Sequence, residues 1–143
     1  MKNKIIFFFI FISLNISYGQ NKSFQDAIDE SNVNKILLKI DCDSINSIVN
    51  EDIKNESIFI FLNGGVAPIR FSTDEIFEKK YNVHFYEQGC VNSLCAESYN
   101  MIIFDYLKNA YGKKWMKEIR DDAVGFKKWK KLNRKQQNKK SKS

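Results

Sequence analysis

Apolar residues follow strand-like patterns in the middle of the chain and helix-like patterns after it. Residues 57–62 (SIFIFL) are a continuous apolar run followed by Asn-Gly-Gly, which is typical of a buried strand that ends in a turn. Residues 83–87 alternate between apolar and polar side chains, which predicts a second strand. Between them, Ser72 and Glu75 fit a capping box and predict a helix at 73–81. The order of strand, helix and strand predicts a βαβ-like unit.

The second half of the chain predicts helices that would cover this sheet. Residues 95–111 place apolar side chains three and four positions apart, and residues 113–124 continue this spacing after a glycine. Shorter helices are expected after Ser23 and after Asp43, whereas the run 35–40 is too short to separate a strand from a helix. The whole pattern predicts one small α/β (or α+β) domain, with a two- to three-stranded sheet packed by C-terminal helices.

The first twenty residues have the three parts of a secretory signal peptide. Lys2 and Lys4 form a basic start, residues 5–14 form an apolar run, and Ser17 and Gly19 are small residues at the positions that signal peptidase reads. The apolar run is shorter than the roughly 20 residues that span a bilayer. We therefore expect cleavage near Gly19 and export to the periplasm or the extracellular space, with no transmembrane helix in the mature chain.

Charge divides the expected mature chain into an acidic body and a basic end. The whole chain carries a net charge of +6, yet residues 126–143 contain nine basic residues and no acidic one. We therefore expect a leader at 1–19, a globular domain at 20–125 and a largely disordered basic tail at 126–143.

The basic tail is a candidate for binding an anionic surface. The residues that would carry this binding are Lys127, Lys128, Lys130, Lys131, Arg134 and Lys135. For an exported protein, the expected partner is anionic envelope lipid or another envelope protein. Nucleic acid is disfavoured as a partner because the tail has few aromatic side chains on which bases could stack.

Three cysteines, Cys42, Cys90 and Cys95, remain in a compartment that permits disulfides. The favoured interpretation is a structural Cys90–Cys95 disulfide. The alternatives are free thiols, or a bond from Cys42 to either partner. A thiol site of Cys90, Cys95 and His84 is also considered, because the start of the helix predicted at 95–111 would stabilise a thiolate. Thioredoxin-type redox enzymes separate their cysteines by two residues and not by four, which disfavours that mechanism.

Metal and cofactor chemistry is not expected. A zinc site needs three or four ligands that converge on one point, and the chain offers one histidine and three cysteines without a paired C-x-x-C spacing. A zinc site is therefore disfavoured, including one formed by Cys42, His84, Cys90 and Cys95. We expect no cofactor, no metal and no assigned catalytic residue.

Several short motifs spread from residue 64 to residue 125. They are Gly64-Gly65-x-x-Pro68, FEKKY at 77–81, GCV at 89–91, YNxxIFxYL from Tyr99, and YGxxWxxEIRxDxxG from Tyr111. These motifs resemble a group of short secreted bacterial proteins of unassigned function, which are similar in length and in export signal. The resemblance covers about half of the mature chain. It implies the same compartment and domain limits, and it carries over no functional residue.

The function that these patterns favour is a non-catalytic binding or interaction module of the cell envelope. A thiol-dependent enzyme or redox protein that uses Cys90 and Cys95 is one alternative. Binding of anionic envelope lipid through the basic tail is the other.

Overall fold

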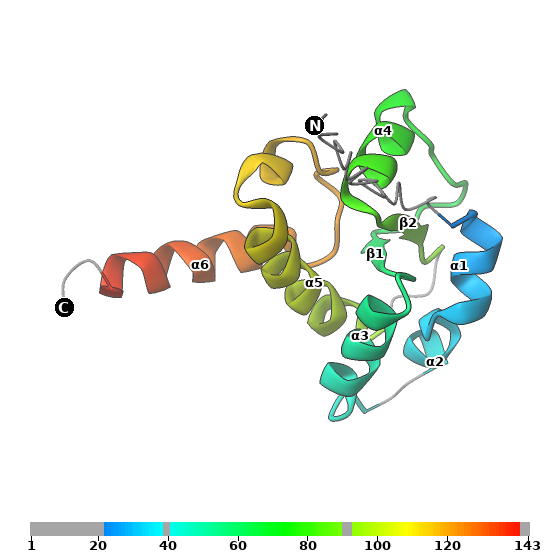
Figure 1. The fold of residues 1–143 in the computed structure, drawn as a ribbon, viewed down its shortest axis with the longest axis horizontal. Helices are drawn as coiled ribbons and strands as arrows, with labels where there is room; N and C mark the ends of the chain where they lie inside the picture. Colours follow the sequence, from blue (N-terminus) through cyan, green and yellow to red (C-terminus); the bar gives the residue numbers. More distant parts are fainter. Residues whose placement is uncertain (1–21, 39–40, 90–92, 141–143) are drawn as a thin grey trace, which may run out of the picture.

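The computed structural model describes residues 22–38, 41–89 and 93–140, with side chains up to residue 137 (Figure 1). The expected leader at 1–19 lies outside the described residues. The elements are α1 (Phe24–Glu30), α2 (Val33–Leu38), α3 (Ile45–Lys54), β1 (Phe59–Leu62), α4 (Ser72–Tyr81), β2 (His84–Glu87), α5 (Ala96–Tyr111), the 3-10 helix η1 (Lys114–Lys117) and α6 (Phe126–Lys140). A small mixed α/β domain is therefore confirmed. Within the described ranges, no helix has the length and apolar character needed to cross a membrane.

The predicted βαβ-like unit is confirmed. The strands β1 and β2 are parallel neighbours, with Phe59 opposite His84 and Leu62 opposite Glu87. The connection between them carries α4. In Figure 1 the two short strands lie at the centre of the molecule, with helices around them.

The first turn of α4 is closed differently from the prediction. The carboxylate of Asp74 accepts a hydrogen bond from the backbone N–H of Phe71 at 2.9 Å. Asp74 therefore makes the capping contact that was expected from Glu75. Glu75 pairs instead with Lys79, one helical turn later. Asp74 is buried, and its carboxylate also accepts a hydrogen bond from Arg120.

Aromatic side chains cover both faces of the sheet. On one face, α1 brings Phe24 edge-on to Phe59, with 5.9 Å between the ring centroids. On the opposite face, Phe85 stacks on Phe77 of α4 at 5.1 Å. Every residue of β1 is buried, as expected from its continuous apolar run.

The outer edge of β1 is satisfied by a side chain and by a late segment of the chain. The buried Asn100 on α5 accepts a hydrogen bond from the Phe61 N–H at 2.9 Å and donates to the Phe61 carbonyl at 2.8 Å. The Val124 N–H donates to the same carbonyl at 2.9 Å, and Leu62 forms an antiparallel bridge with Ala123. The edge of the sheet is thus closed without a third full strand.

This pairing explains why the prediction of a helix at 113–124 is wrong. Only Lys114–Lys117 is helical there, as one 3-10 turn. Trp115, Ile119 and Ala123 are buried, but the backbone beyond η1 turns toward the edge of β1 instead of continuing a helix. A long-range pairing has overridden the local spacing.

A group of buried polar side chains joins α3 to α5. The Tyr99 hydroxyl donates to the Asp52 carboxylate at 2.9 Å, and Asn32 donates to Asp52 through its backbone N–H at 3.0 Å and through its side chain at 2.7 Å. Burial raises the pKa of Asp52, and burial raises the pKa of Tyr99 well above its ordinary value. These hydrogen bonds fix the relative placement of α3 and α5.

The basic tail is ordered over its described part, which corrects the expectation of disorder at 126–143. Phe126–Lys140 forms α6, and Phe126 and Trp129 are buried against Phe104 and Trp115. The indole N–H of Trp129 donates to Asp105 at 2.9 Å. The aromatic side chains anchor the first two turns of a helix whose composition alone would favour disorder.

Candidate functional site

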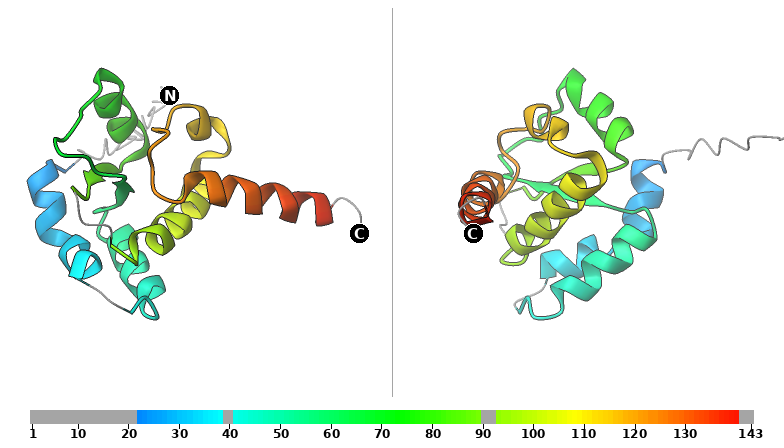
Figure 2. Two further views of the ribbon diagram at one scale, coloured as in Figure 1. Left: turned by 180° about the vertical axis from the view of Figure 1, so that it is seen from behind. Right: turned by 60° about the vertical axis from the view of Figure 1, so that its left-hand side comes forward.

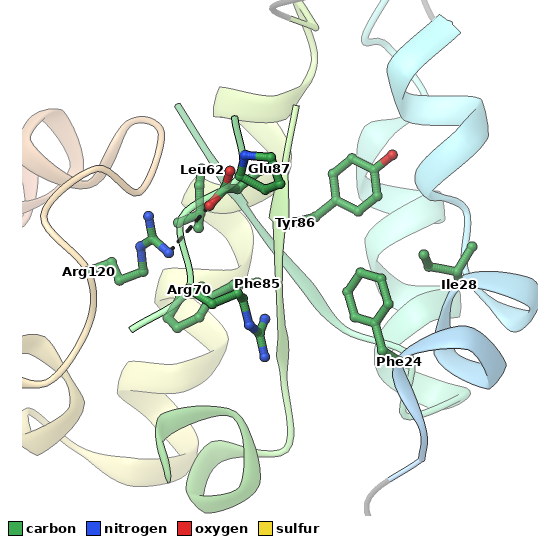
Figure 3. A pocket seen from close by; sticks show the side chains of 9 residues that line it. Phe24, Ile28, Leu62, Arg70, Phe85, Tyr86, Glu87 and Arg120 are labelled. Carbon is green, nitrogen blue, oxygen red and sulfur yellow. Dashed lines mark ion pairs between the residues drawn. The ribbon is translucent and has the colours of Figure 1, made fainter. Parts of the chain in front are cut away.

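A cleft lies at the carboxyl ends of β1 and β2, beside their last residues Leu62 and Glu87 (Figure 3). Its volume of about 480 Å³ lies within the range of small-molecule sites. In open α/β sheets, ligands bind in the crevice outside the carboxyl ends of parallel strands. The lining comes from α1, the strand ends and two loops: Phe24, Ile28, Leu62, Pro68, Arg70, Phe85, Tyr86, Glu87 and Arg120.

One wall of the cleft is apolar. Phe24 and Ile28 lie one turn apart on α1 and face Tyr86 of β2 in Figure 3. The side chain of Ser23 caps α1 by accepting the Asp26 N–H at 3.2 Å, which sets where the helix begins. Phe24 remains 44% exposed, so part of its ring is open to a ligand.

The opposite wall is organised around Arg120, whose side chain is only 7% exposed. Its guanidinium donates to Asp74 at 3.0 Å, to both carboxylate oxygens of Asp122 and to the carbonyl of Ile69. An ion pair with Glu87 at 3.5 Å, drawn in Figure 3, connects this group to the end of β2. Hydrogen bonding to Asp122 raises the pKa of Arg120, so the guanidinium stays charged.

A second arginine completes the charged wall. Arg70 forms a bidentate pair with Glu78 at 3.0 and 2.8 Å, and the same carboxylate accepts the Phe85 N–H at 2.7 Å. Hydrogen bonding to Glu78 raises the pKa of Arg70. The Arg70 side chain is 54% exposed, so it still presents donors to the cleft.

The loops that follow the two strands touch beside the cleft. A Cβ atom on Gly64 would lie 2.1 Å from the carbonyl oxygen of Gly89, closer than any side chain tolerates. Glycine at residue 64 therefore permits the two loop backbones to meet. The backbone N–H of Ile69 in the first loop donates to both oxygens of Glu87, which holds this loop against the end of β2.

The cysteines are paired differently from the favoured interpretation. Cys95 is bonded to Cys42, with 5.4 Å between their Cα atoms, so the favoured Cys90–Cys95 disulfide is corrected to one of the alternatives. Packing of the segment before α3 against the start of α5 brings together two cysteines that are 53 residues apart. Cys90 lies outside the described residues.

The thiol site is not assembled by the described residues. Cys95 is held in a disulfide, and the rings in contact with His84 are Phe24 and Phe59, at 6.0 and 5.4 Å. Burial lowers the pKa of His84, which favours its neutral form. His84 is therefore a packed aromatic residue at the edge of the core. In the described ranges, no group of three histidine, cysteine or acidic side chains could hold a metal ion.

The basic candidates lie on α6, away from the cleft. Lys128 pairs with Glu97, and the Lys130 ammonium lies 4.7 Å from the centre of the Phe126 ring. The remaining ones, Lys127, Lys131, Arg134 and Lys135, are exposed and form no ion pair within the described part of the chain. The cleft and the basic residues of α6 therefore lie at different places on the molecule.

The residue pattern did not identify the cleft. Arg120 falls inside the helix expected at 113–124, and Arg70 has no spacing signal that links it to Arg120. The weak signals were the Asn-Gly-Gly turn after a buried strand and the expected parallel unit, which together point to the carboxyl edge of the sheet.

Few polar side chains line the cleft. Among the described lining residues, the polar side chains are Arg70, Tyr86, Glu87 and Arg120, and this set contains no nucleophile beside a general base. Comparisons with protein-family models, with curated protein sequences and with solved structures find no match to this chain.

Proposed function

We propose that this protein is a non-catalytic binding protein of the cell envelope, and that the cleft beside β1 and β2 holds a small amphipathic ligand. The observation that carries the proposal is that an apolar wall and a charged wall face each other across the same cleft. The envelope location rests on the signal-peptide pattern of residues 1–20.

The apolar wall favours a ligand with an aromatic or short aliphatic body. Such a body would lie between Phe24 and Tyr86 and would cover ring surface that water now contacts. Burial of apolar surface contributes about 25 cal/mol per Å². Aromatic faces on two sides also favour a flat ligand.

The charged wall favours hydrogen-bond acceptors on that ligand. A guanidinium has five N–H donors, and the bidentate contact with Glu78 uses two of those on Arg70. On the side of Phe24 and Ile28, the Tyr86 hydroxyl forms no hydrogen bond within the described ranges, so it offers one further polar group. Four carboxylates, those of Asp74, Glu78, Glu87 and Asp122, pair with the two arginines of this wall, so a highly charged anion is disfavoured there. A neutral acceptor, or a single negative charge placed at the exposed donors of Arg70, fits this balance of charges.

The competing thiol enzyme has less support. A nucleophilic cysteine must be a thiolate, and Cys95 is committed to its bond with Cys42. The cleft residues also offer no thiol.

A fluorescence titration with 1-anilinonaphthalene-8-sulfonate, an aromatic monoanion, tests the proposal. We expect saturable 1:1 binding to the wild-type protein. Ile28→Trp fills the cleft and weakens binding on the order of tenfold or more, equivalent to about 1.4 kcal/mol. Arg70→Gln weakens binding by removing donors while leaving the apolar wall intact.

The matched control is Leu38→Trp, which adds the same side chain at an exposed residue of α2 that does not line the cleft. This control binds the probe as the wild type does, and its thermal unfolding verifies the fold. Equal affinity of Ile28→Trp and Leu38→Trp would show that the probe binds elsewhere and would refute the proposed site.

A further inference from the structure

The helix α6 carries a row of cations on the side that faces away from the body. Lys127, Lys131 and Lys135 are spaced by four residues, so their side chains lie one above another, and Arg134 lies beside them. The buried residues of the same helix, with Phe126 and Trp129 first among them, point the other way. We define the four exposed residues without an ion pair as the basic face: Lys127, Lys131, Arg134 and Lys135.

The basic face is held out from the domain. In Figure 1 and in the left view of Figure 2, α6 leaves the body beside α5 and extends away from it. Its first turns are pinned by Trp129, which is 3% exposed and bonded to Asp105. The cations are therefore presented on a helix with one fixed end, and not on a free tail.

The basic face is short of counter-charge. The pairs Lys127–Lys131 and Lys131–Lys135 place like charges at i, i+4, which destabilises a helix. Within the described part of the chain, the acidic residue that pairs with α6 is Glu97, through Lys128. A surface that supplies many negative charges would remove this repulsion.

We infer that the basic face binds the anionic lipid surface of a membrane by electrostatic attraction. Three of its four cations are lysines, which act as point charges toward many phosphates, whereas base edges are read by bidentate contacts for which the guanidinium fork of arginine is better suited. The aromatic side chains Phe126 and Trp129 are buried, so they are not available for stacking on bases. Charge complementarity without exposed rings fits a lipid surface better than a nucleic acid.

The inference is independent of the proposed ligand of the cleft. The lining residues of the cleft and the basic face share no member. Ile28→Trp is therefore expected to bind vesicles as the wild type does, so failure of one proposal leaves the other testable.

The test is sedimentation with vesicles of phosphatidylglycerol and phosphatidylcholine, against vesicles of phosphatidylcholine alone. The protein is purified from producing cells, and mass spectrometry defines its N-terminus. We expect binding to the anionic vesicles that weakens as salt is added. Each cation near an anionic surface contributes about a fivefold factor, so Lys127→Gln, Lys131→Gln and Lys135→Gln together weaken binding on the order of 100-fold.

Two controls keep the result specific. Replacing exposed lysines outside α6, with Lys54→Gln, Lys114→Gln and Lys117→Gln, makes the same change in net charge and leaves binding within a few-fold of the wild type. Changing the three lysines of the basic face to arginine retains binding and shows that charge is required. Circular dichroism verifies that α6 stays helical in each variant.

Three results would overturn the inference. The first is wild-type affinity in the glutamine triple variant. The second is an equal loss in the Lys54, Lys114 and Lys117 control. The third is tighter binding to duplex DNA than to anionic vesicles at the same phosphate concentration, which would assign the basic face to nucleic acid.

Discussion

Arg120→Met is the change that most directly tests how the cleft is built. Methionine keeps an unbranched stem beside the ring of Phe71, which lies 4.8 Å from the Arg120 guanidinium carbon. It removes every hydrogen bond and ion pair of that guanidinium. Asp74, which is 1% exposed, and the largely buried Glu87 then lose their cation.

The size of the effect follows from burial. Removing one partner of a buried ion pair costs about 3–5 kcal/mol, because the remaining charge stays out of water without compensation. For a domain of this size, such a loss lowers the melting temperature by roughly 10–20 °C. The loop at Ile69 also loses its contact with Arg120, so probe binding in the cleft weakens.

The assay is urea unfolding followed by circular dichroism, with a double-mutant cycle between Arg120→Met and Asp74→Asn. Asparagine can still accept the Phe71 N–H through its side-chain oxygen. Because asparagine is neutral, the loss of Arg120 leaves no unpaired charge at residue 74. The double variant is therefore expected to be at least as stable as Arg120→Met alone. Lys80→Met, which breaks an exposed pair with Glu118, is the control and changes stability little.

Two results would refute this reasoning. One is a loss of less than about 1 kcal/mol in Arg120→Met, which would mean that the charges are effectively solvated. The other is simple addition of the Arg120 and Asp74 effects, which would mean that the two residues do not interact.

Three further predictions concern the disulfide, α6 and the half-buried His84. Peptide mapping without reduction is expected to recover a Cys42–Cys95 link, and a Cys90–Cys95 peptide would contradict this. In the chain-entropy description, reduction of the bond lowers the free energy of unfolding by about 4 kcal/mol. Trp129→Ala costs about 3–5 kcal/mol in urea unfolding because it empties a buried site, whereas a disordered tail would show no loss. Burial lowers the pKa of His84 below 6.5 in the folded protein, so the wild type loses stability relative to His84→Phe as pH falls through 6.5; parallel pH profiles of the two proteins would contradict this.

The parts of the fold that were predictable are those that local patterns determine. The apolar run at 57–62, the alternation at 83–87 and the helix between them each bury a face that the residue order defines. Their combination is a parallel pair with a crossover helix, as expected.

The parts that were not predictable depend on long-range packing. Trp115, Ile119 and Ala123 have helical spacing, yet the edge of β1 recruits the backbone around Ala123 into a bridge. For the cysteines, closeness in sequence favoured Cys90 as the partner of Cys95, while the packing of α3 and α5 selects Cys42.

The basic end shows how composition can mislead. Nine cations without an acid favour disorder, although Phe126 and Trp129 are spaced i, i+3. Those two rings find partners on α5 and η1, and the buried surface orders the helix. Arg120 was missed for a related reason, because its partners at residues 69, 74 and 87 come together only in the folded chain.

The most direct test of the proposed binding function is a map of the probe's contacts by ¹H–¹⁵N NMR. We expect 1-anilinonaphthalene-8-sulfonate to shift the amide signals of Phe24, Ile28, Tyr86, Glu87 and Arg120, with little change on α6. Shifts that concentrate away from these residues, or that scatter over the surface without saturating, would contradict it.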